Sequence, residues 1–373
     1  MTPTLSRLRS AWLRSVATRS VATRAVAALA VALLAAAPAA AQRVTLLTHD
    51  SFALPEELVR SFEEEHGVEL RLLAGGDAGA MLNRALLTAG RPIADALFGI
   101  DDALIAREGA AALFEPYLAD GVDAVPAELR FAGELLTPVT VGYVAFNVDL
   151  AGLEARGLAV PDDLTDLTTP AYRGATVVPD PATSSPGLAF LLTTVARFGE
   201  GGDYDWLDYW AELRDADLRV ASGWSDAYYT AFSRYGGDRP IVLSYATSPA
   251  AEVIFAEEPL DEAPTRTLLC DRCAWRQIEA AGVLAGAGEP DAARELVDFL
   301  LSEEVQAAVP TSMFVYPARA DVPLPDEFER FAPRPSAAQT ATLPAERIEA
   351  EQARWLEQWT RVVRQGRDPD EVR

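Results

Sequence analysis

Short apolar runs alternate with amphipathic segments along most of the chain. The runs at 44–48, 68–73 and 94–99 have the length and composition of buried strands. Between the first two, Leu58, Val59 and Phe62 share one helical face, in a segment that begins at Pro55 and ends at Gly67. A second helix over 81–87 separates the second and third strands. This β-α-β-α-β order predicts an α/β fold.

The same alternation continues to the end of the chain. Further strands are predicted at 139–147, 175–179, 218–221, 241–245 and 278–285, and helices at about 290–307 and 345–364. A length of 373 residues predicts about two domains.

Residues 1–41 differ from the rest of the chain. They carry five arginines and no acidic residue, and the apolar run 25–37 precedes three alanines at 39–41. This pattern predicts a secretory signal at 1–41, cleaved after Ala41, because thirteen apolar residues are too few to span a bilayer. We therefore expect a soluble periplasmic protein without membrane insertion, whose net charge changes from −24 to −29 on cleavage.

Composition excludes several classes of function. All 32 basic residues are arginine, which rules out P-loop NTPases and lysine Schiff-base enzymes. His49 and His66 are the only histidines, too few for a three-histidine zinc site. The acidic balance disfavours nucleic-acid binding. No Gly-x-Ser-x-Gly motif is present, and the adjacent pair Asp101 and Asp102 is weak support for acid–base catalysis, so we predict binding without turnover and without a cofactor.

The loops that follow the predicted strands carry polar residues, and ligands of open α/β sheets bind at these strand ends. Ser184 or Ser185 before Pro186, and the Thr247-Ser248 pair before Pro249, have the pattern of helix N-caps. We expect both helix N-termini to face one cleft. For either loop alone, ordinary capping is the alternative interpretation.

An ordered set of motifs makes the chain recognisable. The motifs are Asp50-Ser51-Phe52, Leu82-Asn83-Arg84, Asp180-Pro181 with Thr183-Ser184 and Pro186-Gly187-Leu188, Gly223-Trp224-Ser225-Asp226-Ala227-Tyr228, Leu243-Ser244-Tyr245 with Thr247-Ser248-Pro249-Ala250, and Pro310-Thr311 with Tyr316-Pro317. Together they resemble the periplasmic thiamine-binding proteins of ABC importers, from about Val44 to Trp359.

The resemblance implies a two-lobed periplasmic-binding-protein fold of type II. It places 42–140 and 285–373 in lobe 1 and 141–284, with the hinge segments, in lobe 2. The ligand cleft lies between the lobes, which crossing strands join. The implied protein is a monomer that binds thiamine, or its phosphates, and delivers it to a membrane permease and, through the permease, to the ATPase.

The resemblance also implies the ligand contacts. A cationic thiazolium and a flat aminopyrimidine suit stacking on aromatic rings and charge complementarity from carboxylates. Hydroxyl groups and helix N-termini suit the hydroxyethyl or phosphate end. The implied contacts are Asp77, Ala78, Ser184, Ser185, Trp224, Tyr245, Ala246, Thr247 and Ser248, with Asp50 and Tyr228 as further candidates.

Three positions depart from the family pattern. His49 replaces a common tyrosine, Phe314 a common tryptophan, and Ala182 a basic residue, which weighs against thiamine phosphates more than against thiamine. The adjacent tyrosines Tyr228 and Tyr229 leave ferric iron, or another small cation bound by a protein of the same fold, as the alternative ligand.

Two further pairs of residues have structural interpretations. Cys270 and Cys273 favour a local disulfide in an exported protein, with a redox or half-zinc site as the alternative. Trp355 and Trp359, four residues apart, favour core packing or lobe clamping over ligand contact.

Overall fold

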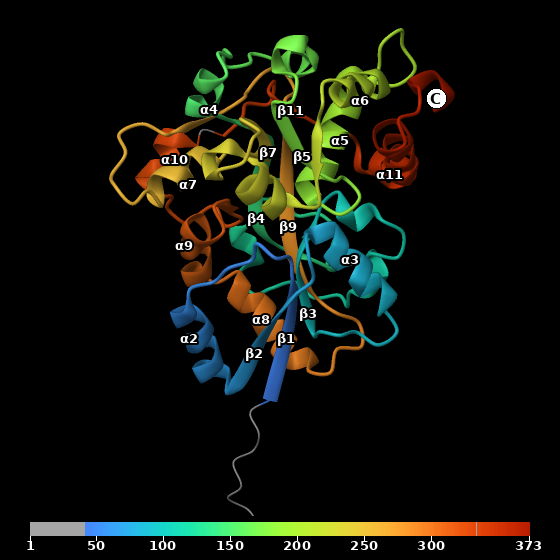
Figure 1. Ribbon diagram of the computed structural model, residues 1–373. Coiled ribbons are helices and arrows are strands. Elements are labelled where there is room, and N and C mark those ends of the chain that lie inside the picture. The colour runs from blue at the N-terminus through green and yellow to red at the C-terminus, as the bar shows by residue number, and fades with distance from the viewer. Residues whose placement is uncertain (1–41, 333) are drawn as a thin grey trace, which may run out of the picture. The chain divides into compact units, whose positions relative to one another are not determined.

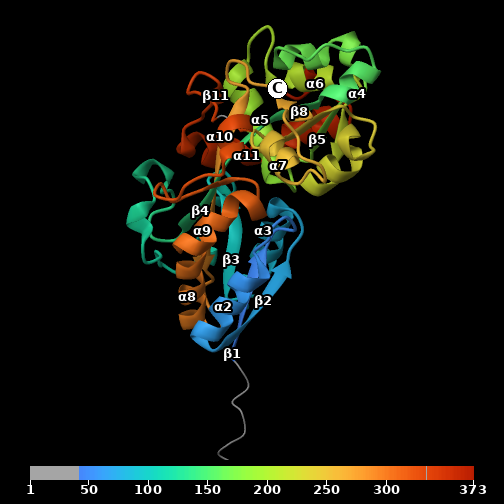
Figure 2. The same cartoon turned by 90° about the vertical axis from the view of Figure 1, so that its left-hand side faces the viewer.

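The computed structural model describes residues 42–332 and 334–373 (Figures 1 and 2). The predicted signal at 1–41 lies outside the described residues. Residues Arg43–Arg373 form one compact unit. Within the described ranges, no helix combines the length and the apolar character needed to cross a membrane.

One mixed sheet runs through this unit. Its main path has the order β2-β1-β3-β9-β4-β7-β5-β6, with β8 and β10 paired to β4 and β11 paired to β9. The strands are β1 Gln42–Thr48, β2 Val68–Ala74, β3 Ala96–Asp101, β4 Thr137–Asp149, β5 Thr176–Pro179, β6 Arg219–Ala221, β7 Ile241–Tyr245, β8 Thr265–Thr267, β9 Ala274–Val283, β10 Tyr316–Pro317 and β11 Thr340–Ala341. All predicted strands are present, although β9 begins four residues before its predicted start.

Every predicted helix has a counterpart, and the structure adds helices that were not predicted. They are α2 Glu56–His66, α3 Ala78–Leu87, α4 Leu150–Ala155, α5 Ser185–Phe198, α6 Trp206–Asp215, α7 Ser248–Ile254, α8 Pro290–Leu300, α9 Glu303–Ser312, α10 Asp326–Phe331 and α11 Ala345–Trp359. The single helix predicted over 290–307 is wrong. Ser302 accepts a hydrogen bond from the Val305 backbone N–H and begins α9, so the helix divides at Leu301.

Strand direction divides the sheet into two sides. Strands β1 and β3 are parallel, as are β5, β6 and β7. Along the main path, β9 and β4 in the middle pair antiparallel with their neighbours, whereas the short β11 pairs parallel with β9. We call β1–β3 with α2 and α3 the β1 side, and β5–β7 with α5–α7 the β5 side. Figure 1 shows these sides at opposite ends of β9. This is the two-lobed fold with crossing strands that the sequence predicts.

Tryptophans form the centre of the β5 side. Trp206, Trp210, Trp355 and Trp359 are fully buried, and the rings of Trp210 and Trp359 meet edge to face with centroids 5.7 Å apart. The packing role predicted for Trp355 and Trp359 is therefore confirmed. Their helix α11 packs against α6, so this contact joins segments assigned to different predicted lobes. The lobe boundaries stay a prediction.

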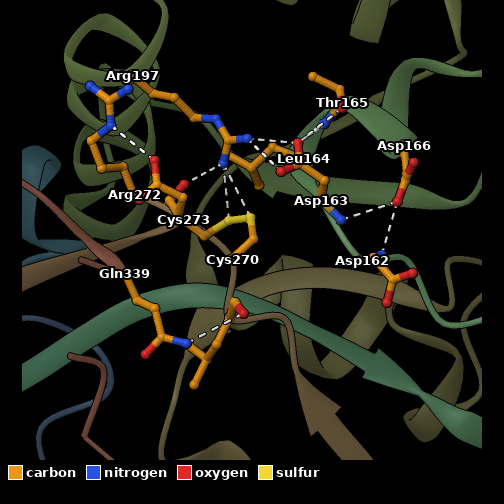
Figure 3. The surroundings of a disulfide bond; sticks show 12 residues. Asp162, Asp163, Leu164, Thr165, Asp166, Arg197, Cys270, Arg272, Cys273 and Gln339 are labelled. Atoms are coloured by element: carbon orange, nitrogen blue, oxygen red, sulfur yellow. Dashed lines mark hydrogen bonds and ion pairs between the residues drawn. A yellow bond between two sulfur atoms is a disulfide. The ribbon is translucent and has the colours of Figure 1, made fainter. Parts of the chain in front are cut away.

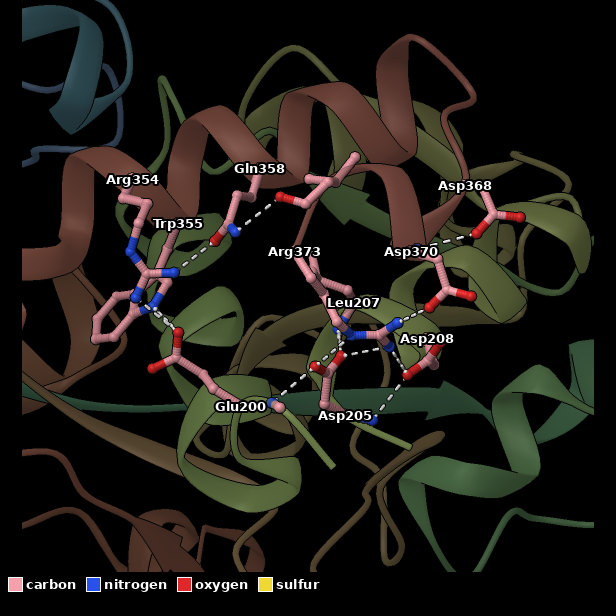
Figure 4. Close-up of polar contacts among 12 residues, drawn as sticks. Glu200, Asp205, Leu207, Asp208, Arg354, Trp355, Gln358, Asp368, Asp370 and Arg373 are labelled. Atoms are coloured by element: carbon pink, nitrogen blue, oxygen red, sulfur yellow. Dashed lines mark hydrogen bonds and ion pairs between the residues drawn. The ribbon is translucent and has the colours of Figure 1, made fainter. Parts of the chain in front are cut away.

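The last residue of the chain is also fixed to this side. Arg373 pairs with Asp205, Asp208 and Asp370 (Figure 4). Asp205 is the N-cap of α6, where its side chain accepts from the Leu207 backbone N–H. The cation thus compensates a carboxylate that begins a core helix.

Cys270 and Cys273 are joined in the predicted local disulfide. Figure 3 shows the Arg197 guanidinium between this disulfide and Asp163. Its Nη1 donates to the Asp271 carbonyl oxygen (2.6 Å) and lies 3.1 and 3.2 Å from the two sulfurs, and its Nη2 donates to both Asp163 oxygens. One arginine of α5 therefore fixes two loops.

Candidate ligand-binding site

A cavity of about 590 Å³ lies where the two sides of the sheet meet. Its volume is within the range of small-molecule sites. The β1 side contributes residues after β1 and at the start of α3, and the β5 side contributes the starts of α5 and α7 and the segment after β6. The lining residues are His49, Ser51, Asp77, Ala78, Ser185, Pro186, Trp224, Tyr228, Tyr229, Arg234, Tyr235, Tyr245, Ser248, Ala251, Glu252, Phe255, Ala256, Glu257, Glu279, Met313, Phe314 and Val315.

Asp77 connects the two sides of the cavity. It is the N-cap of α3, where Oδ1 accepts from the Ala78 backbone N–H (2.7 Å). Its Oδ2 accepts from the Trp224 backbone N–H on the β5 side, also at 2.7 Å. Burial raises the pKa of Asp77, and these bonds, together with the adjacent Ser184 hydroxyl and His49, oppose the rise.

Aromatic rings form one wall. The rings of Trp224 and Tyr228 are stacked, with centroids 5.1 Å apart and planes at 15°, and Tyr245 lies 6.4 Å from Trp224. The Trp224 indole N–H donates to the Ser244 hydroxyl (2.9 Å). This bond fixes the orientation of the ring, one face of which is stacked on Tyr228.

Tyr228 and Tyr229 belong to a π-helix, Asp226–Ala231. In an ordinary α-helix, consecutive side chains point in different directions, but here both rings line the cavity, edge to face with centroids 5.3 Å apart. Tyr228 donates through its hydroxyl to Glu252 (2.7 Å). π-helical turns occur often at functional sites.

Buried carboxylates lie behind the opposite wall. Ser185 donates to Asp101 through its hydroxyl, and the backbone N–H groups of Ala103 and Leu104 donate to the same carboxylate. Burial raises the pKa of Asp101 to about 6. Burial and the neighbouring Asp101 raise the pKa of Asp102 to about 7.

Glu279 of β9 and His49 meet at the cavity. Glu279 Oε2 accepts from the Thr140 hydroxyl (2.8 Å), and Oε1 lies 3.5 Å from His49 Nε2. His49 Nδ1 accepts from the Ser51 backbone N–H, so the imidazole proton is assigned to Nε2. Burial lowers the pKa of His49 and raises that of Glu279 to about 7.

The outer part of the cavity is aromatic and partly exposed. Tyr229, Tyr235 and Phe255 are 48%, 45% and 59% exposed. Arg234 Nε donates to Glu252 (2.7 Å), which pairs the one arginine among the lining residues with a buried glutamate. This part therefore combines apolar surface with one exposed carboxylate, that of Glu257.

The structure brings seven of the predicted contacts into the cavity lining and leaves four outside it. The seven are Asp77, Ala78, Ser185, Trp224, Tyr228, Tyr245 and Ser248. Asp50 is exposed and accepts from the Gly76 backbone N–H. Ser184 is buried beside Asp77, Ala246 donates through its backbone N–H to the Tyr143 carbonyl oxygen, and the Thr247 hydroxyl donates to the Phe314 carbonyl oxygen.

The predicted hydroxyl caps of α5 and α7 are wrong. Ser184 and Thr247 occupy the N-cap positions, but neither side chain caps its helix. The Thr247 hydroxyl donates to the Phe314 carbonyl oxygen, and the Ser248 hydroxyl forms a hydrogen bond with the Ser244 hydroxyl (3.0 Å). The Thr247 hydroxyl therefore connects two loops, and the Ser248 hydroxyl connects the start of α7 to β7. Ser185, Pro186 and Ser248 still place the helix starts at the cavity, as predicted.

Sequence reasoning missed several lining residues, above all Glu279, Glu252 and Tyr235. Glu279 lies inside a strand that reads as apolar and buried. The available signal was the alternation of Gln277 and Glu279 within that strand, because side chains two residues apart point to the same face. Two polar residues on one face of a buried strand indicate a polar site.

Comparisons with known proteins agree with this geometry. The family model described as bacterial extracellular solute-binding protein matches residues 92–339. The chain is 31% identical over 333 residues to the thiamine-binding periplasmic protein of Salmonella typhimurium, across 87% of this chain and 95% of that protein. It is 32% identical over 326 residues to that of Escherichia coli, across 86% and 93%.

Solved structures give the same result. A periplasmic thiamin binding protein superposes with a TM-score of 0.75 at 28% identity, across 87% of this chain and 96% of that one. Iron-bound HitA from Pseudomonas aeruginosa superposes with a TM-score of 0.66 at 19% identity, across 85% and 99%. The second likeness concerns the fold alone.

Proposed function

Because the chain belongs to the bacterial extracellular solute-binding protein family, we propose that it captures thiamine in the periplasm and delivers it to an ABC importer. The observation that carries this proposal is one cavity that combines stacked aromatic rings, buried carboxylates and hydroxyl groups. Two relatives that match nearly its whole length are named for thiamine binding, which supports the same ligand.

The chemistry of thiamine fits this lining. Trp224 and Tyr245 offer ring faces to the thiazolium or the aminopyrimidine, and a cation on an aromatic face contributes about 0.5–2 kcal/mol. The Ser185 and Ser248 hydroxyls lie at the starts of two helices, where they can receive the hydroxyethyl arm. The Asp77 and Glu279 carboxylates supply negative charge that complements the cationic thiazolium.

Binding coupled to closure is the mechanism that we propose. A ligand that contacts Asp77 on the β1 side and Trp224 on the β5 side stabilises the state in which these residues meet. A permease can then distinguish the loaded monomer by its closed form, and the ATPase is engaged through the permease. The ligand leaves chemically unchanged, so the protein is not an enzyme.

Calorimetric titration of the mature protein tests the ligand. Thiamine should bind one to one and raise the melting temperature, and Trp224→Ala should weaken binding by about 2 kcal/mol through loss of stacking and burial. Leu87→Ala, at a side chain 88% exposed and outside the cavity lining, is the control. Absence of thiamine binding would overturn the proposal.

Thiamine phosphates should bind more weakly than thiamine. Arg107 donates to the Ala182 carbonyl oxygen (3.2 Å), but it is not among the lining residues, and Arg234 is paired with Glu252. A phosphate therefore finds no unpaired arginine among the described lining residues. Parallel titrations with thiamine monophosphate and diphosphate measure this order, which equal affinities would contradict.

Ferric iron is the alternative ligand, because Tyr228 and Tyr229 both line the cavity. Phenolate ligation requires a deprotonated hydroxyl, whereas burial and Glu252 raise the pKa of Tyr228 well above its usual value. We expect no tyrosinate charge-transfer band when Fe³⁺ is added. A strong visible band would favour iron instead.

A further inference from the structure

The inner part of the cavity holds acidic groups without a basic partner. Asp77 and Glu279 both line it, and His49 is the neighbouring ring. Among the described residues, no arginine forms an ion pair with either carboxylate. A buried carboxylate without a cation is costly, so it becomes protonated or recruits a positive charge.

Asp77 and Glu279 differ in the hydrogen-bond partners of their carboxylate oxygens. Asp77 uses Oδ1 for Ala78 and Oδ2 for Trp224, both at 2.7 Å, so each oxygen has a backbone partner. These bonds cap α3 and connect the two sides of the cavity. Asp77 therefore has a structural task in the closed state, where both of its oxygens are already occupied.

Within the described part of the chain, Glu279 has only neutral hydrogen-bond partners. Thr140 donates to Oε2, and the Gln277 side chain also hydrogen-bonds the carboxyl, whereas Oε1 lies 3.5 Å from His49 Nε2, too far for a good hydrogen bond. Nε2 itself is buried and has no hydrogen-bond partner. Oε1 therefore faces a weakly held neutral donor rather than a cation.

The position of Glu279 suits a cation held on the aromatic wall. Its charge acts on the Tyr245 hydroxyl, which lies 3.5 Å from Oε1 of Gln277, two residues along the same face of β9. Tyr245 is in turn 6.4 Å from Trp224. A positively charged ring that stacks on these two aromatics lies in the field of the Glu279 carboxylate.

Resting on the proposed function, we propose that Glu279 is the residue that makes the cavity select a cationic ligand over a neutral one of the same shape. The ligand's positive charge compensates the buried carboxylate, with His49 as the neutral neighbour that leaves this charge unpaired in the free protein. Asp77 positions the two sides, and Glu279 determines which charge the ligand must carry.

Proton exchange accompanies this selection. Burial raises the pKa of Glu279 to about 7, and a permanent cation favours the ionised form. Thiamine binding should therefore tighten as pH rises from 6 to 8. The titratable groups that surround Glu279 on neighbouring elements are His49, Asp77, Asp101, Asp102 and Tyr245.

Three probes separate charge from shape. Thiamine and pyrithiamine carry a thiazolium and a pyridinium cation, whereas 3-deazathiamine carries a neutral thiophene of similar size. We expect the wild-type protein to bind both cations about 30-fold or more tightly than the neutral probe. Glu279→Gln keeps the size of the side chain. It should weaken the binding of both cations, so that the affinities for the three probes differ by no more than a few-fold. It should also remove most of the pH dependence of thiamine binding.

Glu258→Gln is the matched control, because Glu258 is exposed and is not among the lining residues. Its three affinities should equal those of the wild type. If Glu279→Gln fails to fold, as shown by its melting curve, the wild-type measurements still test the proposal, because equal affinities for the three probes, or affinities that do not change between pH 6 and 8, would overturn it.

The other outcomes distinguish failure of the role of Glu279 from failure of thiamine binding. Equal wild-type affinity for thiamine and 3-deazathiamine, or an unchanged preference in a folded Glu279→Gln protein, overturns the role of Glu279 and leaves thiamine binding intact. Failure of the wild type to bind any of the three probes overturns the proposed function and this inference with it.

Discussion

Two glycines allow the side chains of the cavity to take their positions. A Cβ at Gly142 would lie 2.7 Å from Cε1 of the Tyr245 ring, and one at Gly223 would lie 2.8 Å from Asp77 Oδ2. Neither distance is compatible with van der Waals packing. The absence of a side chain at these positions therefore determines where an aromatic wall residue and a connecting carboxylate can lie.

Gly142→Ala should weaken thiamine binding by about 1–2 kcal/mol, because the added methyl group displaces the Tyr245 ring. Calorimetry measures the affinity, and the melting temperature of the free protein shows whether the fold is kept. Gly90→Ala is the control, since a Cβ there meets nothing within 4 Å. Wild-type affinity in Gly142→Ala would show that the ring position is unimportant.

Among the helices, α5 has functions at both of its ends. Its start carries Ser185 and lines the cavity, and its last turn carries Arg197, which binds Asp163 and the disulfide loop (Figure 3). Burial alone would raise the pKa of Asp163, but hydrogen bonds from Arg197 and Thr165 lower it overall. The far end of the helix thus anchors the element that positions Ser185.

Arg197→Met should reduce the free energy of unfolding at pH 7 by about 2 kcal/mol, because the Asp163 carboxylate loses the guanidinium whose Nη2 donates to both of its oxygens. Asp163 has a lowered pKa in the folded state, so its contribution is present above its unfolded pKa and disappears as pH falls. Urea unfolding at pH 7 and pH 3 should show the difference between variant and wild type shrinking at pH 3.

Arg60→Met, at an exposed position of α2, provides the comparison and should change little at either pH. A loss in Arg197→Met that is equally large at pH 3 would mean that packing, and not the ion pair, is responsible.

Much of each element was predictable because its signals are local. Pro55 and Gly67 delimit α2, and Gly67 takes the left-handed conformation (φ 68°) that a helix C-cap favours. The caps of α5 and α7 were not predictable in the same way. The Thr247 hydroxyl is hydrogen-bonded to Phe314 and the Ser248 hydroxyl to Ser244. The contact with Phe314 joins residues far apart in the sequence.

Glu279 was not predictable as a site residue for a related reason. Its partners Thr140 and His49 come from β4 and from the loop after β1, and only the folded sheet brings the three together. The ordered loop motifs could be predicted as site residues because they lie at strand ends, where the fold class itself places ligands.

Across the whole unit, the two sides of the sheet meet through polar contacts that include buried acids. Asp77 accepts from Trp224, Asp101 accepts from Ser185, and the Ala80 backbone N–H donates to the Thr183 carbonyl oxygen (3.1 Å). The pKa values of Asp77 and Asp101 are raised by burial. Without a cationic ligand, closure therefore has an electrostatic cost that grows with pH.

The free protein should lose stability as pH rises from 4 to 8. An acid whose pKa is raised by folding is more easily ionised in the unfolded chain. Its contribution to stability is therefore complete below its unfolded pKa and is lost as pH rises through its folded pKa, which is about 7 for Asp102. Asp102→Asn keeps an oxygen that can accept from the Ile278 backbone N–H. It should raise the free energy of unfolding at pH 8 by about 2 kcal/mol and not at pH 4.

Urea unfolding without ligand at the two pH values measures this effect. Asp123→Asn, at a side chain 99% exposed, should leave stability unchanged at both. Equal stability of Asp102→Asn and wild type at pH 8 would contradict a raised pKa at this position.

The distribution of indole rings gives the cavity an optical property. Trp206, Trp210, Trp275, Trp355 and Trp359 are at most 5% exposed, whereas Trp224 is partly exposed and faces the cavity. A small neutral quencher such as acrylamide should therefore reach Trp224 ahead of these five. The fraction of the tryptophan fluorescence that acrylamide can quench therefore reports whether the cavity is open, filled or closed, without any attached dye.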